Sequence, residues 1–392
     1  MAALTDSSEV LFESGPFPHI QWSLGLFRPV ARKVGPRALF CVLLGWLPLV
    51  VLILAESRTT TIPLVSSFFG DVAVHARSLV AVPLFVLLES WCLPRLGAIG
   101  WHFVKSGLVE ENDLPRFNEL VASTRRLLNS LVAEIVAIIL TYGFVLAIVF
   151  YLPPTILPFW YSRGSTVNLS LSWAGWWYAF VSTPLLLILL FGWLWRVVLW
   201  SRFLIRVAKM KLRLIAAHPD LSSGLKFLNS AVITFTPVGF TLGVIVAGSV
   251  ANRFLQQRSS VNNVEKTILG LLIFNLFLFV GPLVVFTFKL YQQKVRGIFT
   301  YGQLAESVGK QFEAKWLTNY EKYSSGALEA SDFSATTDLY QVVSNVYQMS
   351  LLPFDLRSIV ALVVVTLLPF VPVAFIAIPF DVILKEIASL LF

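Results

Sequence analysis

The sequence predicts an all-α fold, a polytopic transmembrane helical bundle of about seven spans, and two observations carry this prediction. Of the 392 residues, 57% are hydrophobic and only 13% are charged, whereas soluble domains are about 45–50% apolar and about 25% charged. The apolar residues come in runs of roughly twenty, the length that crosses about 30 Å of hydrocarbon at about 1.5 Å per residue. These runs therefore predict membrane spans and not the core of a soluble domain.

The hydrophobic runs divide the chain into four parts. Residues 1–37 form an N-terminal segment without an apolar run, which is unlike a cleavable signal peptide. Residues 38–290 hold six spans, residues 291–357 form a helical segment, and residues 358–392 hold the last span and the tail. The expected spans are residues 38–55, 78–98, 131–152, 174–197, 229–251, 267–290 and 358–382.

The last expected span is interrupted by three prolines, Pro369, Pro372 and Pro379. Proline removes a backbone donor and breaks or kinks a helix. The segment is therefore either a proline-broken span or a re-entrant hairpin, which a membrane protein tolerates where other helices surround it.

Lysine and arginine gather in alternate loops, beginning with Arg28, Arg32, Lys33 and Arg37 before the first span. Because positively charged loops stay on the cytoplasmic side, this pattern predicts a cytoplasmic N-terminus. On the same side we expect three amphipathic helices, over residues 112–129, 296–318 and 335–350. They are too short for an independent catalytic domain, but a protein partner or a second copy of the chain could bind to them.

Charged side chains inside the spans are the first candidates for function. Glu89 is expected roughly 13 Å deep, where a carboxylate usually faces the bundle interior or a water cavity and marks an ion pathway. Glu134, Arg95 and Arg196 are expected in the cytoplasmic half and could converge with it. The alternative is an interhelical ion pair, or a protonated Glu89, that holds the bundle together.

Two helix breaks are the second candidate. Pro237 and Gly239 lie in the fifth span, and Gly281 and Pro282 lie at a similar expected depth in the sixth, with Asn275 nearby. Transporters bind ions and substrates at the backbone groups of broken helices. The alternative is that these prolines only shape helix packing.

Four small residues spaced by four form a smooth ridge along the fifth span. They are Gly239, Gly243, Ala247 and Ala251. Such a ridge predicts close helix packing, either against a neighbouring span or against a second protomer.

Basic residues follow the fourth span at helical spacing. Arg202, Arg206, Lys209 and Arg213 would share one face of a helix. Such a face attracts anionic lipid headgroups by about 1 kcal/mol per charge. We therefore expect anionic lipids at the cytoplasmic face, although a phosphate-bearing ligand, or retention of the loop by its positive charge, would explain the same pattern.

His218 and Asp220 lie in the loop before the fifth span. They could bind a ligand, but Pro219 ends one helix there, and Asp220 could cap the next one. The sequence shows no zinc spacing, Walker loop, dinucleotide motif or nucleophile elbow, so we expect no catalytic residue, metal or cofactor, and the protein is not expected to be an enzyme. The charge of +8 is spread over loops, which does not predict nucleic-acid binding.

Three stretches of the C-terminal half are similar to recurrent pieces of uncharacterised bacterial multi-pass membrane proteins: AHPDLSSGLKFL at 217–228, GPLVVFTFKL at 281–290 and LPFDLRSIV at 352–360. This resemblance implies the bacterial inner membrane as location, and no activity.

From the residues, the first hypothesis is transport of an ion or small solute, in a transporter or channel. The alternatives are a membrane scaffold or accessory subunit, and a membrane-embedded or lipid-modifying enzyme.

Overall fold

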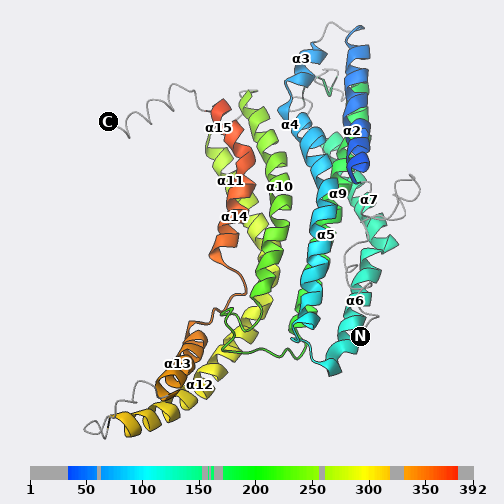
Figure 1. The fold of residues 1–392 in the computed structure, drawn as a ribbon. Helices are drawn as coiled ribbons and strands as arrows, with labels where there is room; N and C mark the ends of the chain where they lie inside the picture. The colour runs from blue at the N-terminus through cyan, green and yellow to red at the C-terminus, as the bar shows by residue number, and fades with distance from the viewer. Residues whose placement is uncertain are drawn as a thin grey trace, which may run out of the picture.

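A computed structural model describes residues 34–59, 63–151, 158, 160–162, 171–255, 261–317 and 331–377 (Figure 1). Helices make up most of these residues, as the sequence predicts. Six are long and apolar enough to cross a membrane, and a seventh candidate is a pair of helices bent by 43°. The longer helices are α2 (Val34–Glu56), α5 (Val82–Lys105), α6 (Leu114–Leu128), α7 (Leu131–Tyr151), α9 (Thr183–Ala208), α10 (Asn229–Leu255), α11 (Val261–Phe279), α12 (Thr287–Trp316), α13 (Ser331–Gln348) and α14 (Leu356–Leu367).

Two of the spans are longer than their apolar runs predict. Short helices precede α5 and α9 without a break, so continuous helical rods cover Val72–Lys105 and Trp173–Ala208, with 34 and 36 residues. At about 1.5 Å per residue each rod is about 50 Å long, well beyond the hydrocarbon thickness. The end of α9 packs against α6, and Trp101 near the end of α5 packs on Phe117 of α6 with ring centroids 5.7 Å apart. The first rod begins with α4 (Val72–His75) and η2 (Ala76–Ala81), and the second with α8 (Trp173–Trp177) and η5 (Tyr178–Ser182).

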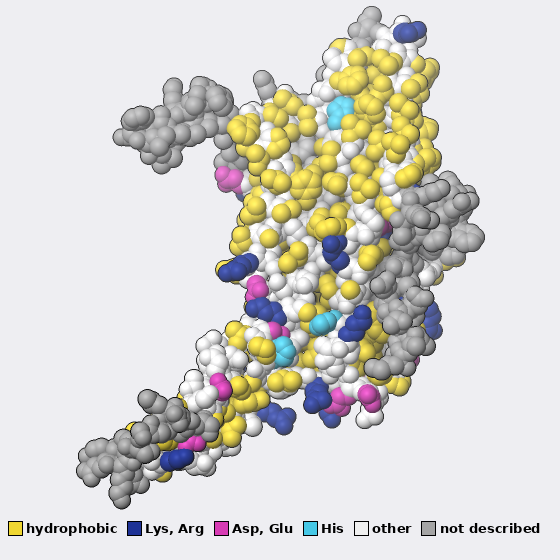
Figure 2. All heavy atoms as spheres, viewed as in Figure 1, with side chains coloured by type: hydrophobic (Ala, Val, Ile, Leu, Met, Phe, Trp, Pro, Cys, Tyr) yellow, Lys and Arg dark blue, Asp and Glu magenta, His cyan; other side chains and the backbone are white. Residues whose placement is uncertain are grey.

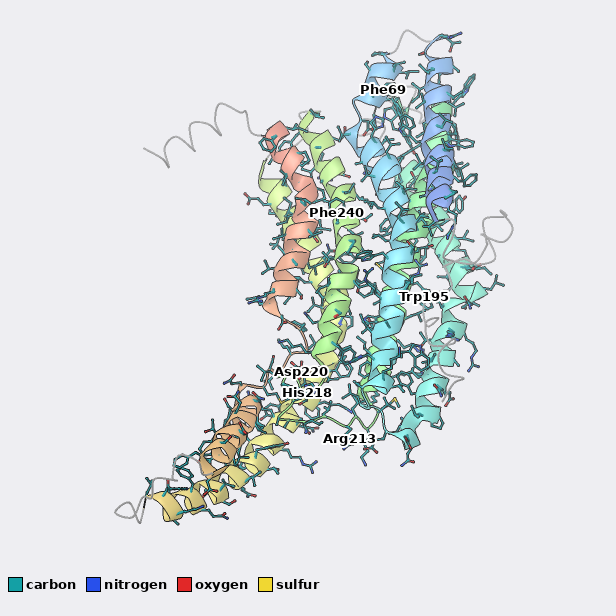
Figure 3. All side chains as sticks on the ribbon, in the orientation of Figure 1. Phe69, Trp195, Arg213, His218, Asp220 and Phe240 are labelled. Carbon is teal, nitrogen blue, oxygen red and sulfur yellow. The ribbon has the colours of Figure 1, made fainter. Side chains whose placement is uncertain are left out.

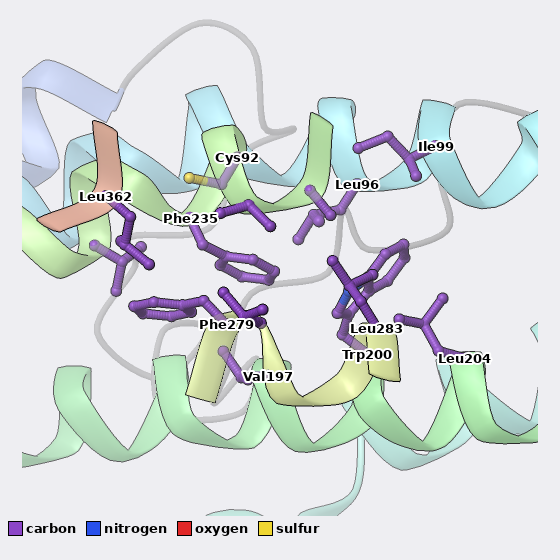
Figure 4. Packing of buried hydrophobic residues seen from close by; sticks show 14 of the residues in the cluster. Cys92, Leu96, Ile99, Val197, Trp200, Leu204, Phe235, Phe279, Leu283 and Leu362 are labelled. Atoms are coloured by element: carbon purple, nitrogen blue, oxygen red, sulfur yellow. The ribbon is translucent and has the colours of Figure 1, made fainter. Parts of the chain in front are cut away.

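Helix α10 lies at the centre of the bundle and is the most buried candidate span. It packs against α5 and α14, and the residues at its core include Phe235, which stacks on Phe279 of α11 with ring centroids 5.2 Å apart. Figure 4 shows how this stack meets Cys92 and Leu96 of α5. The core thus joins helices from both halves of the sequence.

The predicted break at Pro237 is wrong, because α10 runs through Pro237 as one helix. The break at Gly281–Pro282 is present. There α11 ends at Phe279, the 3₁₀ helix η7 follows over Gly281–Phe286, and α12 leaves at 43°. Proline removes one helical hydrogen bond in both places, but only the second proline follows directly on a glycine, which has the weakest helix propensity after proline.

The last segment runs along α10 as a proline-interrupted helix. After α14 come the 3₁₀ turn η10 (Leu368–Phe370) and α15 (Val371–Ala377), and all three pack on α10. Leu356–Ile376 is long enough to span, so the described part favours the span over the re-entrant hairpin. Pro379 lies outside the described residues.

Helices α12 and α13 form a two-helix arm that projects from one end of the bundle (Figure 1). The 30-residue α12 continues beyond η7, and α13 returns along it. The root of the arm is held by Lys294, which donates to the carbonyl of Met349 at 2.8 Å, and by Gln293, which donates to the carbonyl of Leu214 at 2.8 Å. We call this end of the bundle the arm end.

The outer faces of the spanning helices are apolar. Figure 2 shows hydrophobic side chains over the middle of the visible face and most of its lysines and arginines toward the arm end. Val132 on α7 and Phe277 on α11 are 69% and 76% exposed. Large apolar side chains exposed in this way along spanning helices are expected where lipid surrounds the protein.

Candidate functional site

Glu89 and Arg196 form a buried ion pair between α5 and α9. Arg196 Nη2 donates to Glu89 Oε1 at 2.9 Å, and Arg37 Nη2 of α2 donates to Oε2 at 3.2 Å. Arg37 belongs to the first turn of α2, so Glu89 lies level with the start of that span and not halfway along it. These side chains connect three helices, and the two arginines compensate the charge of the carboxylate.

Arg95 and Glu134, which the sequence allowed to converge with Glu89, lie elsewhere. The guanidinium of Arg95 is exposed, lies 3.3 Å from the centroid of the Trp91 ring and donates to the Trp91 carbonyl. Glu134 is buried on α7, where it lines a groove against α9. Six residues at about 3.6 per turn place Arg95 roughly 120° from Glu89 around α5, so the spacing alone already separates these two side chains. How α7 is rotated against its neighbours, which places Glu134, does not follow from the spacing.

Asn275 is buried among small and hydroxyl-bearing residues of α10 and α14. Its Nδ2 donates to Thr366 Oγ1 at 3.2 Å, and a Cβ added to Gly239 would lie 3.4 Å from that nitrogen. Its Oδ1 has no hydrogen-bond partner among the described residues. The expected closeness of Asn275 to the fifth span is therefore present, with Thr366 as a third member that the sequence did not indicate.

The small-residue ridge on α10 begins against α14. A Cβ on Gly243 would meet the Thr366 backbone oxygen at 2.3 Å, and one on Gly239 would meet Thr366 Oγ1 at 2.9 Å. Ala247 and Ala251 continue the ridge and are buried. The two glycines therefore serve packing within one chain, which was the first of the two alternatives.

The four basic residues that follow the fourth span, Arg202, Arg206, Lys209 and Arg213, form the predicted basic stripe. The end of α9 divides them. Arg202 and Arg206 lie on the helix and Lys209 caps it, and all three line a pocket of about 530 Å³ against α6. Arg213 is placed differently: the helix ends at Ala208, and the Arg213 amide donates to the Leu108 carbonyl at 2.8 Å in an extended loop. The prediction of a continuous helical face that includes Arg213 is wrong.

Asp220 organises the loop before α10 by accepting backbone hydrogen bonds. Oδ1 accepts from Ser222 N at 2.8 Å and Gly224 N at 3.0 Å, and Oδ2 accepts from Lys226 N at 3.1 Å. His218 Nδ1 lies 2.8 Å from Oδ1. Partial burial acts to raise the pKa of Asp220, but the backbone donors and His218 outweigh it and hold this pKa below its usual value.

This loop borders a pocket of about 440 Å³ near the root of the arm, where Figure 3 shows His218 and Asp220 close together. Arg213 and His102 also line it. Both oxygens of Asp220 accept backbone N–H donors, one of them from Lys226, the first residue of the 3₁₀ turn η6 (Lys226–Leu228), so the carboxylate orders the loop; the N-cap position of η6 itself is Leu225. Among the residues that the structure describes, no three metal-ligating side chains converge.

A polar network at the opposite end of the bundle was missed by the sequence interpretation. Asp71 is buried, accepts from Trp160 Nε1 at 2.9 Å and caps α4 through Val74 N. Arg77 donates to Tyr178 at 3.0 Å and to Ser249 at 2.7 Å. An aspartate directly before a hydrophobic run is a helix-start signal that could have indicated the capping contact of Asp71 with Val74 N.

The fold and its exposed apolar faces define the class of the chain: a polytopic α-helical membrane protein. Comparison with protein-family models, with curated protein sequences and with solved structures finds no match.

Proposed function

We propose that the chain is a membrane-anchored scaffold or accessory subunit that binds a protein partner through the tip of its α12–α13 arm. The observation that carries this proposal is the aromatic cluster at the tip. Phe333 packs on Phe312 and Trp316, with ring centroids 5.0 Å and 4.9 Å away. Phe333 is nevertheless 43% exposed, and Leu317 beside the cluster is 62% exposed.

The position of the tip favours a protein partner over lipid. Helix α12 has 30 residues, so at about 1.5 Å per residue its end lies about 45 Å along the helix from η7. The exposed aromatic residues therefore lie far along the arm from the spanning helices (Figure 1). Trp, Tyr and Phe are enriched in protein interfaces relative to the rest of the protein surface.

The orientation is part of the same proposal. We infer that the arm end faces the cytoplasm of a bacterial inner membrane, because most lysines and arginines lie in loops at that end of the spans. The resemblance of residues 217–228, 281–290 and 352–360 supports the choice of membrane.

The test is site-specific photocrosslinking in cells that naturally produce the protein. A crosslinker at Phe333 should give a discrete protein adduct, and Phe312→Ala should remove that adduct while the membrane bundle keeps its melting temperature. A crosslinker at Gln303, an exposed polar position on α12 away from the tip, is the matched control. The proposal fails if both positions give the same adducts, or if Phe333 gives none in well-folded protein.

Transport of an ion or small solute is the second candidate. The observation that favours it is the buried Asn275 Oδ1, which lacks a hydrogen-bond partner among the described residues and lies six residues before Gly281 at the break. Polar groups inside a bundle often belong to ion or substrate pathways.

Flux into proteoliposomes separates this candidate from the scaffold. Wild-type protein should pass a common ion or small solute, and Asn275→Leu should reduce that flux at equal reconstitution, whereas Arg95→Ala should not change it. Glu89→Gln belongs in the series with a folding control, because its ion pair also supports the bundle. Wild-type protein without flux over a panel of ions and small solutes would remove this candidate.

A further inference from the structure

One face of α9 borders a groove that changes from apolar to basic along the helix. The apolar part, about 430 Å³, lies between α9 and α7, and the basic part, about 530 Å³, lies between α9 and α6. Leu127, near the end of α6, lines both parts. The two parts are therefore neighbours along one continuous seam.

The basic part holds far more positive than negative charge. Arg202, Arg206 and Lys209 come from α9, Arg116 and Arg126 come from α6, and Glu119 is the one carboxylate that lines it. Arg202 Nη2 donates to Ser123 Oγ at 2.9 Å, while its buried Nη1 has no partner among the described residues. Guanidinium groups held in this way favour phosphate oxygens, which they bind with two parallel hydrogen bonds.

The apolar part is built for a hydrocarbon chain. Its walls include Val136 and Leu140 of α7 and Phe191, Leu194 and Val198 of α9. Ser130 and Glu134 are its polar members, and both lie in or next to the first turn of α7, on the side of the basic part. Trp195 Nε1 donates to the Leu127 carbonyl at 3.2 Å and ties the walls where the two parts meet.

The junction between the parts lies at the depth where the spans begin. Helix α7 starts at Leu131 beside the junction, and Arg37 in the first turn of α2 reaches Glu89, the partner of Arg196 on α9. Phe191 and Leu194 therefore lie within the spanning region, Val198 lies at its edge, and Arg202 and Arg206 lie about 9 Å and 15 Å beyond Arg196 at 1.5 Å per residue. Long arginine side chains from this stretch of α9 can reach back to the phospholipid headgroups that border the hydrocarbon.

We propose that this groove binds one anionic glycerophospholipid from the leaflet at the arm end. Its phosphate lies on Arg202 and Arg206 with Arg126 opposite, and one acyl chain lies along α9 between Val198 and Phe191. The lipid is favoured over free phosphate because the apolar part continues the basic part into the spanning region. This site depends on the spanning fold and not on the proposed role of the arm tip.

The test measures lipids that stay bound when the full-length protein is released from nanodiscs into native mass spectrometry. From an equal mixture of phosphatidylglycerol and phosphatidylcholine of the same chain length, we expect one phosphatidylglycerol retained, with about tenfold preference or more. Arg202→Gln with Arg206→Gln should remove the preference. Arg296→Gln, which removes one exposed positive charge from α12, should leave it intact.

Two further experiments distinguish the lipid from a free phosphate. Ala133→Leu puts a larger side chain into the apolar part, so it should lower phosphatidylglycerol retention while the melting temperature stays near that of the wild type. Glycerol 3-phosphate, which has the phosphate without the chains, should not displace the bound lipid at millimolar concentration. Equal retention of both lipids, an equal loss in Arg296→Gln, or displacement by glycerol 3-phosphate would each overturn the proposal.

Discussion

Arg196 of α9 donates to Glu89 of α5 over 2.9 Å, and the arginine is completely buried. The two residues are 107 positions apart in the chain. Arg196 Nη2 makes this bond, and Arg196 Nε and Nη1 have no hydrogen-bond partner among the described residues, so Glu89 is the main compensation for the arginine charge. The pair connects two helical rods that pass beside the centre of the bundle.

We expect Arg196→Ala to destabilise the bundle strongly. Removing one member of a buried ion pair typically costs about 3–5 kcal/mol, and Arg196→Ala would leave Glu89 with Arg37, which is 3.2 Å away and partly exposed. Arg95→Ala, one turn and a half from Glu89 on α5 but exposed, should cost less than about 1 kcal/mol. Melting temperatures in detergent check both, and similar losses in the two variants would contradict the structural role of the pair.

Two glycines in spanning helices should respond oppositely to alanine. A Cβ on Gly243 would lie 2.3 Å from the Thr366 backbone oxygen, so Gly243→Ala must push α14 away, at a cost of about 1–3 kcal/mol or more. Gly270 on α11 has nothing within 4 Å of an added Cβ, and alanine there should be neutral or stabilise by up to about 1 kcal/mol. Thermal unfolding of the two variants measures the contrast, and a tolerated Gly243→Ala would show that α10 and α14 are not in this contact.

Gly297 at the root of the arm and Gly309 in its outer part are a second pair of glycines that should respond differently to alanine. A Cβ on Gly297 would meet Ala216 Cβ at 2.6 Å and Val346 Cγ1 at 2.9 Å, both short and rigid side chains. A Cβ on Gly309 would meet only the hydroxyl of Tyr340, the end of a long side chain that can move. We expect Gly297→Ala to speed hydrogen exchange in α13 severalfold and Gly309→Ala to leave it unchanged. Equal exchange in both variants would place α13 away from the arm root.

The Asp220 loop should lose stability in acid. Because the folded-state pKa lies below the ordinary value of about 3.9, the ionised carboxylate stabilises the loop at pH above that value. This contribution is lost as the pH falls through the lower folded-state pKa. The difference in melting temperature between wild type and Asp220→Asn should therefore be largest above about pH 5 and shrink toward about pH 3. A difference that is constant over this range would exclude the carboxylate as its source.

The length and composition of the apolar runs determined, without any tertiary information, that the chain is a helical membrane protein with six or seven spans. The physical reason is local: the bilayer fixes how many consecutive apolar residues a span needs. The amphipathic segment that became α6 was also predicted from a local pattern. Phe117, Leu120 and Val121 recur at helical spacing, and they are buried in the structure.

Only the tertiary structure decided which side chains meet. Rotation and tilt of the helices bring Glu89 to Arg196 and Arg37 and place Glu134 in a different groove. The end of α9 at Ala208 removes Arg213 from the basic stripe, and the passage of α10 through Pro237 removes one of two expected breaks. These outcomes depend on contacts between helices far apart in sequence, which hydrophobic periodicity within a single helix does not encode.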